Sequence, residues 1–158
     1  SYFVGPPRDE KDRVLRSEAQ HLETRVVDTP PDALLLEARW IRRFGPRLNT
    51  RRAVRGGPLE EGVLALRATA APDRSVFFVL REAGLACRAT CTAGPGRSAA
   101  AARRAADALF APGQPDREAG VLVDTWRRLH PEALFLRPAV DGGAPDIAMR
   151  LAEWARSG

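Results

Sequence analysis

The sequence predicts an α+β (or α/β) fold in which a helix–strand–helix unit precedes a small α+β domain with a short antiparallel sheet and three helices. In the first third of the chain, apolar residues recur mainly at helical spacing. A polar stretch broken by Gly56, Gly57 and Pro58 follows, and beyond it the pattern changes to that of short strands. We therefore expect a unit at residues 1–55, a linker at 56–61 and a second domain at 62–158.

The first expected elements are a helix and a strand. Residues 10–22 carry apolar side chains at roughly helical spacing among charges, which predicts an amphipathic helix. Residues 22–28, "LETRVVD", form a short β-rich run. This order gives the first two parts of the helix–strand–helix unit.

A second helix is expected to run through Phe44. Asp28 and Thr29 are candidate N-caps, and two prolines follow where the first helical turn would lie. Gly45 and Pro46 end the helix, because proline disfavours the helical conformation of the residue before it.

The second domain mixes strands and helices. Strands are expected at 62–69, 74–84, 85–92 and 133–138, and helices at 94–110, 115–129 and 144–156. Trp126 and Trp154 fit apolar helix faces and are interpreted as core. The glycine-containing loop that opens 94–110 lacks the spacing of a phosphate loop, so a helix cap with a linker is favoured there.

The charge favours a polyanionic partner. The chain has a net charge of +5 and Lys11 is its only lysine, so arginine carries nearly all the positive charge. One segment gathers many of these arginines: Arg39, Arg42, Arg43, Arg47, Arg51, Arg52 and Arg55. No acidic residue lies between Glu37 and Glu60, so a nucleic-acid surface is favoured over a solvated helix face. A GC-rich coding bias also enriches arginine.

Several other classes of site are disfavoured. The chain shows no apolar run of the roughly 20 residues that a membrane span needs and no signal peptide, so we expect a soluble, cytoplasmic protein with no membrane partner. Cys87 and Cys91 have no histidine nearby, which favours small buried hydrophobes over a disulfide or a metal site. His21 and His130 show no metal-binding spacing, so structural roles are favoured. A Ser-His-Asp triad stays open, although no nucleophile-elbow motif supports one.

Glu37 occupies an unusual place on the second helix. At about 100° per residue, it falls inside an arc formed by Ala33, Leu34, Trp40, Ile41 and Phe44. A carboxylate removed from water without a partner costs several kcal/mol, so Glu37 needs a cation, hydrogen-bond donors or an opening to solvent. A rim position that leans into water and a functional site are both consistent with this pattern.

The segment around Glu37, "DALLLEARWIRRFGPRLN", resembles a stretch of GIY-YIG nucleases, above all those of UvrC-type excinuclease subunits and their exonuclease-fused relatives. The resemblance covers roughly residues 1–55, with "SYF" at 1–3 similar to the end of the first helix of that domain. The block Leu34–Glu37, followed by Pro46, Arg47 and Asn49, is its most specific part.

The resemblance implies a site and its partners. In that family the helix glutamate binds a divalent metal and the asparagine supports the active site, roles that fall on Glu37 and Asn49. The implied cofactor is Mg²⁺ or Mn²⁺, the implied substrate is DNA, and the arginines from Arg39 to Arg55 would lie near phosphate. Implied partners are other excision-repair proteins, or an exonuclease domain in the parent chain.

The sequence also departs from the family. The segments that carry the catalytic tyrosine and arginine lie upstream of "SYF" in the family, while Tyr2 is the only tyrosine here and Leu48 stands where the family usually has tyrosine. We therefore expect a fragment of a nucleotide-excision-repair-like endonuclease that is inactive alone. A degenerate nucleic-acid binder and a split enzyme remain open. So do a non-catalytic, arginine-rich binding module and a structural or protein-interaction module.

Residues 62–158 are similar to the region that follows the nuclease domain in the exonuclease-fused relatives. The similarity lies in the strands and in "REAGVLVDTWRRLHPEALFLRP". No site residues follow from it.

Overall fold

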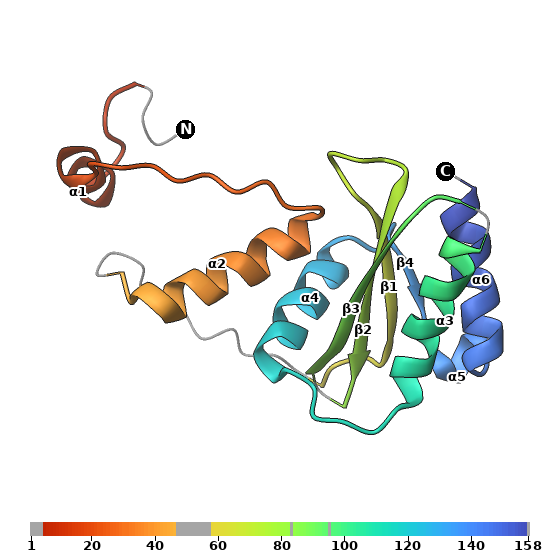
Figure 1. Ribbon diagram of the computed structural model, residues 1–158. Coiled ribbons are helices and arrows are strands. Elements are labelled where there is room, and N and C mark those ends of the chain that lie inside the picture. The colour runs from red at the N-terminus through yellow and green to blue at the C-terminus, as the bar shows by residue number, and fades with distance from the viewer. Residues whose placement is uncertain (1–4, 47–57, 83, 95, 158) are drawn as a thin grey trace.

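The structure is a computed structural model that describes residues 5–46, 58–82, 84–94 and 96–157. It confirms the α+β class. Figure 1 shows a central sheet with helix α4 (Arg117–Leu129) on one face and helices α3 (Arg97–Phe110) and α6 (Ala144–Arg156) on the other. Helices α1 (Glu10–Glu18) and α2 (Pro30–Phe44) lie on the α4 side.

The sheet is antiparallel throughout and its strands run in the order β3-β2-β1-β4. Its members are β1 (Gly62–Arg67), β2 (Arg74–Arg81), β3 (Gly84–Thr92) and β4 (Leu134–Leu136). The expected strands at 62–69, 74–84, 85–92 and 133–138 are thereby confirmed; β1, β2 and β4 are shorter than expected, and β3 begins one residue earlier.

Both faces of the sheet are covered by helices, because alternate residues of the central strands are apolar on both sides. Phe77 on β2 packs toward the alanine-rich face of α3 and toward α6. Its neighbour Phe78 belongs to the opposite core, which contains Val123 of α4. Side chains as small as Ala101 and Ala105 are fully buried on α3, which lets that helix approach closely.

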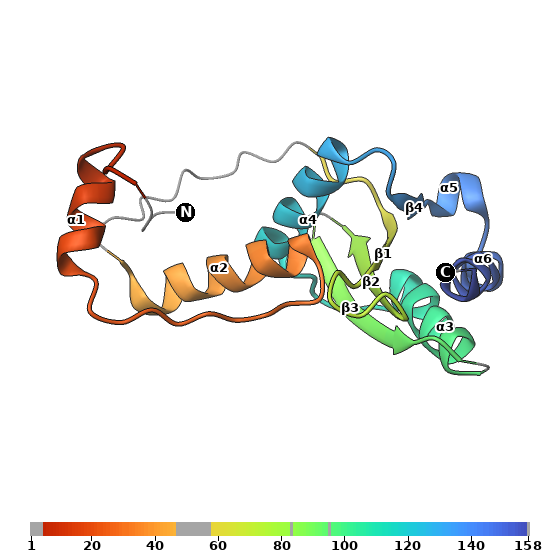
Figure 2. The same ribbon diagram turned by 90° about the horizontal axis from the view of Figure 1, so that it is seen from above.

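The first helices differ in how they are held. Helix α1 ends at Glu18, earlier than the expected 10–22, and it lies apart from the sheet in both views (Figures 1 and 2). Helix α2 confirms its expected bounds, and Thr29 is its N-cap. Gly45 ends it in the left-handed conformation, with φ of 51°.

The strand expected at residues 22–28 is wrong. The backbone from residue 19 to residue 27 forms no helix or strand, and the Val26 side chain is 88% exposed. A β-rich sequence becomes a strand only where a neighbouring backbone supplies hydrogen bonds, and no described strand lies beside this segment. The helix–strand–helix unit is therefore two helices joined by an extended connection among the described residues.

The region expected to be the second domain, residues 62–158, has one more helix than expected among its described residues. The short helix α5 (Pro138–Asp141) follows β4, with Pro138 at its first position. Four residues are too few to show a helical period, so the sequence pattern could not reveal it. The helices expected at 94–110, 115–129 and 144–156 are confirmed as α3, α4 and α6.

The interpretations of the rarer residues hold. Cys91 is buried, Cys87 is half-buried and both are free thiols; burial raises the pKa of Cys87. Trp126 and Trp154 are partly buried and pack against the two cores. Within the described ranges, no helix combines the length and the apolar character needed to cross a membrane.

Candidate functional site

Helix α2 has two faces with different surroundings. On one face, Ala38 is 4% exposed and Leu35 packs against the core beneath α4. Two further contacts tie the helix down: Thr69 donates its backbone N–H to the carbonyl of Asp28 (2.8 Å), and Arg42 pairs with Glu118 of α4 (3.1 Å). The rest of the chain therefore packs against this face of α2, which we call the attached face.

The opposite face of α2 is open and apolar. A cavity of about 410 Å³ lies along it. Its lining consists of Ala33, Leu36, Glu37, Trp40, Ile41, Phe44 and Pro46. Phe44 is 66% exposed, and Leu36, Trp40 and Ile41 are partly exposed, so the described chain leaves much of this face open. We call it the α2 groove.

Glu37 is the single acidic residue in the α2 groove. Its side chain is exposed, and it makes no hydrogen bond or ion pair with any residue that the structure describes. Leu35 and Glu37 lie about 160° apart around the helix, which explains why attachment through Leu35 leaves Glu37 free to face outward. The predicted place of Glu37 among apolar side chains is confirmed, although the apolar arc itself is open.

The arginines on α2 do not line the groove. Arg42 contacts Glu118, and the Arg43 guanidinium lies 5.3 Å from the centre of the Phe44 ring. Arg39 is exposed. The acidic partner of Arg42 lies in a distant part of the chain, so a search for acidic residues in the local sequence could not find it. Phosphate contacts by these residues stay a prediction.

The remaining predicted site residues lie outside the described residues. They are Arg47, Asn49, Arg51, Arg52 and Arg55. Their predicted roles, like that of the "SYF" segment, are therefore not tested by the geometry.

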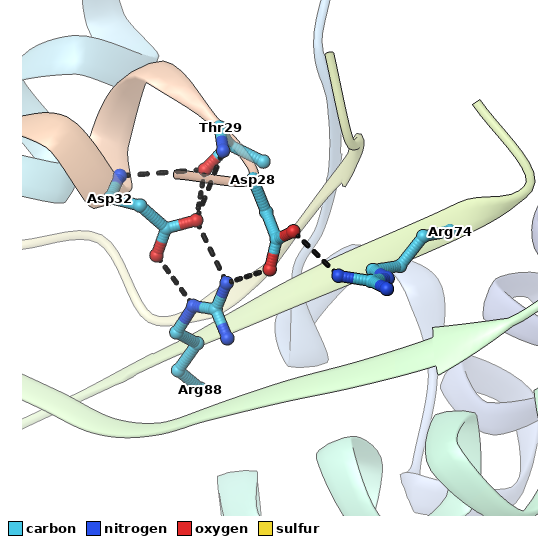
Figure 3. A network of polar contacts seen from close by, with 5 residues as sticks. All are labelled: Asp28, Thr29, Asp32, Arg74 and Arg88. Carbon is cyan, nitrogen blue, oxygen red and sulfur yellow. Dashed lines mark hydrogen bonds and ion pairs between the residues drawn. The ribbon is translucent and has the colours of Figure 1, made fainter. Parts of the chain in front are cut away.

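A cluster of polar residues holds the start of α2 against the sheet (Figure 3). Asp32 accepts hydrogen bonds from the Thr29 hydroxyl (2.8 Å) and from Nη2 of Arg88 on β3 (2.9 Å). Arg88 also donates to Asp28 (2.7 Å), which accepts a further bond from Arg74 on β2 (2.9 Å). We call these five residues the α2 anchor.

Asp28 in the α2 anchor is held in its ionised form at neutral pH. The hydrogen bond from Arg88 holds the pKa of Asp28 below its ordinary value; burial opposes this, and Arg74 reinforces it. The Thr29–Asp32 pair closes a capping box, a pattern visible in the sequence as Thr-x-x-Asp. The partner Arg88 lies 56 residues away from Asp32, so local spacing could not identify it.

Glu37 offers one carboxylate to a divalent ion, and the other side chains that line the α2 groove carry no metal-binding group. Among the described residues, no group of three or more His, Cys, Asp or Glu could hold a metal, so a complete protein cage is not seen there. Mg²⁺ does not need such a cage, because it commonly keeps several waters and takes one or two carboxylates together with substrate phosphates. Glu37, which pairs with no residue that the structure describes, is the one carboxylate that the groove lining supplies toward such a site.

Comparison with known families gives one match. Residues 1–50 match the family model described as the UvrC-like GIY-YIG domain, which confirms the resemblance noted for this part of the chain. No curated protein and no solved structure matches the chain. The match contains α1, α2 and Glu37, and it does not extend to the sheet domain.

Proposed function

We propose that this chain is part of a DNA-repair endonuclease that hydrolyses phosphodiester bonds with a divalent metal, and that Glu37 is a ligand of that metal. The observation that carries the proposal is the Glu37 carboxylate in the α2 groove, which pairs with no described residue and lies inside the segment that matches the UvrC-like GIY-YIG domain. Nucleotide excision repair is the process that we infer from this match.

The surroundings of Glu37 support this role. Helix α2 is fixed at its start by the α2 anchor and along its length by Leu35, so the Glu37 side chain projects from a rigid element. The apolar groove side chains limit the number of competing polar groups beside the carboxylate.

A bound Mg²⁺ or Mn²⁺ would polarise the scissile phosphate and favour attack by water. Within the proposal, Glu37 holds the metal and Asn49 supports the active site. Arg39 and Arg43 do not line the α2 groove, so in this proposal they would contact phosphates away from the cleaved bond, as would the arginines that follow Pro46. The tyrosine and arginine of the family pattern are not assigned to residues of this chain.

The proposal is tested by nicking of supercoiled plasmid DNA. The protein would be produced from its complete gene, including any codons upstream of Ser1, and assayed with and without Mg²⁺. We expect metal-dependent nicking that Glu37→Gln reduces by at least about 100-fold, because the substitution removes a metal ligand while keeping the shape of the side chain.

Glu153→Gln is the matched control, since Glu153 is exposed on α6 and is far from α2 in the sequence. Equal nicking by the parent protein and by Glu37→Gln, with both forms folded, would refute the metal-ligand role. Absence of nicking together with steeply salt-dependent DNA binding would instead favour the non-catalytic binding module.

A further inference from the structure

A second cavity lies at the edge of the sheet, and it shares no lining residue with the α2 groove. Its volume is about 410 Å³. The lining consists of Arg74, Thr90, Cys91, Thr92, Arg97, Ala100 and Arg104. We call it the β3–α3 pocket, because most of its lining residues lie at the end of the edge strand β3 and in the first turns of α3.

The β3–α3 pocket concentrates positive charge without an acidic residue in its lining. Arg97 and Arg104 lie seven positions apart on α3, so both fall on one side of that helix. Neither makes a hydrogen bond or ion pair with any residue in the described parts of the chain. Arg74, the third arginine, already pairs with Asp28 of the α2 anchor.

The start of α3 adds to this field rather than offsetting it. The N-terminal end of a helix carries a partial positive charge and normally attracts acidic side chains. Here the first turn contains no acid, Arg97 is its first residue, and Gly96 provides no side-chain cap. A cation at that end of a helix is unfavourable unless an anion lies nearby.

The edge strand contributes a further feature. β3 is at the end of the sheet, and among the described residues no strand lies beyond its Thr90–Thr92 portion. Gly96, at a φ of 82°, has nothing within 4 Å of the position that a Cβ would take, so the start of α3 is open at that position. The loop lacks a phosphate-loop motif, so recognition here would come mainly from side chains.

We infer that the β3–α3 pocket binds a phosphate group, with Arg97 and Arg104 as its principal contacts. Guanidinium groups suit this role because each offers paired N–H donors to two phosphate oxygens. The phosphate could belong to a nucleic-acid backbone or to a free phosphate compound, and the chemistry of recognition is shared. The inference does not depend on a metal at Glu37.

The test uses the full chain and two probes. The first is a fluorescent DNA duplex whose affinity is followed at several salt concentrations by polarisation. The second is inorganic phosphate, titrated while amide NMR signals around Arg97 and Ala100 are observed. The variant carries Arg97→Gln and Arg104→Gln, and both side chains are exposed, so the fold should persist.

A matched control carries Arg13→Gln and Arg103→Gln, which removes the same net charge from exposed arginines outside the pocket. We expect the pocket variant to lose at least about tenfold in DNA affinity, and its salt slope to fall by about two, since each phosphate contact contributes roughly one. The control should bind nearly as the parent does. Phosphate should shift the pocket signals of the parent and of the control only.

The outcomes separate the two sources. If the pocket variant binds DNA more weakly and also lacks the phosphate-induced shifts, the pocket binds a nucleic-acid backbone. If the variant loses only the phosphate-induced shifts, the pocket binds a free phosphate compound. Unchanged DNA affinity and salt slope, combined with no phosphate-induced shifts at the pocket in the parent chain, would overturn the inference. None of these readouts requires nicking activity, so the proposed endonuclease function can fail without affecting them.

Discussion

Asp32 and Glu37 lie on the same helix and have opposite environments. Asp32 is 9% exposed and is bound by Thr29 and Arg88. Glu37 is exposed and unpaired within the described chain, although it is surrounded by apolar side chains. The first carboxylate is already satisfied by protein donors, so it fixes the helix; the second retains its capacity to bind a cation.

The α2 anchor predicts a pH-dependent contribution to stability. Replacing Arg88 with Met should lower the free energy of unfolding by about 1–3 kcal/mol at neutral pH, because two carboxylates lose their shared partner. The pKa of Asp28 is depressed in the folded state, so this contribution is present above the unfolded pKa and is lost as the pH falls through the folded one.

Urea unfolding of the parent and of Arg88→Met at about pH 6 and about pH 3 measures this effect. The difference between the two proteins should shrink at the lower pH. Arg103→Met provides the control, since the Arg103 side chain is 81% exposed and its removal should change little. A difference that is the same at both pH values would contradict an ionised anchor.

Helix α2 is unusual because the face that packs against the rest of the chain is not its broader apolar face. The residues that attach it to the rest of the chain include Pro31, Leu35 and Ala38, whereas the broader apolar arc remains open. A helix normally buries its most apolar face. An open apolar face is typical of a surface that another element or a partner covers.

Two adjacent leucines test the two faces of α2. Leu35→Ala should cost about 2 kcal/mol of unfolding free energy, because Leu35 packs against the core that includes Leu64 and Phe78. Leu36→Ala should cost at least about 1 kcal/mol less, since Leu36 lines the open groove. Chemical denaturation of the two variants compares them directly. A larger loss for Leu36→Ala would show that the groove face is the packed one.

The local sequence predicted the bounds of this helix, but it did not predict which residues would surround it. The prolines, Thr29 and Gly45 defined the bounds of α2, because caps and breakers act over a few residues. They carried no information on which face would attach, since Arg42 finds Glu118, and Asp32 finds Arg88, across long stretches of sequence. The expected strand at 22–28 failed for the same reason, because a strand needs a partner that the run itself cannot specify.

Over the whole molecule, the two halves differ in how complete their packing is. The sheet domain has helices on both faces and a separate buried core on each (Figures 1 and 2). The first part contributes α2 to one of those cores and leaves the α2 groove open. Composition predicted an interaction with polyanions, but only the structure distinguishes paired arginines, such as Arg88, from Arg97 and Arg104, which pair with no residue in the described ranges.

The most direct test of the central claim, that Glu37 holds a divalent metal, is a map of Mn²⁺ binding over the whole chain. Paramagnetic Mn²⁺, added in small amounts to the isotopically labelled chain, broadens the amide NMR signals closest to the ion. We expect the broadening to centre on Glu37 and its neighbours along the α2 groove, to persist in Glu153→Gln and to disappear in Glu37→Gln. Broadening that centres elsewhere, or that is unchanged in Glu37→Gln, would contradict the account.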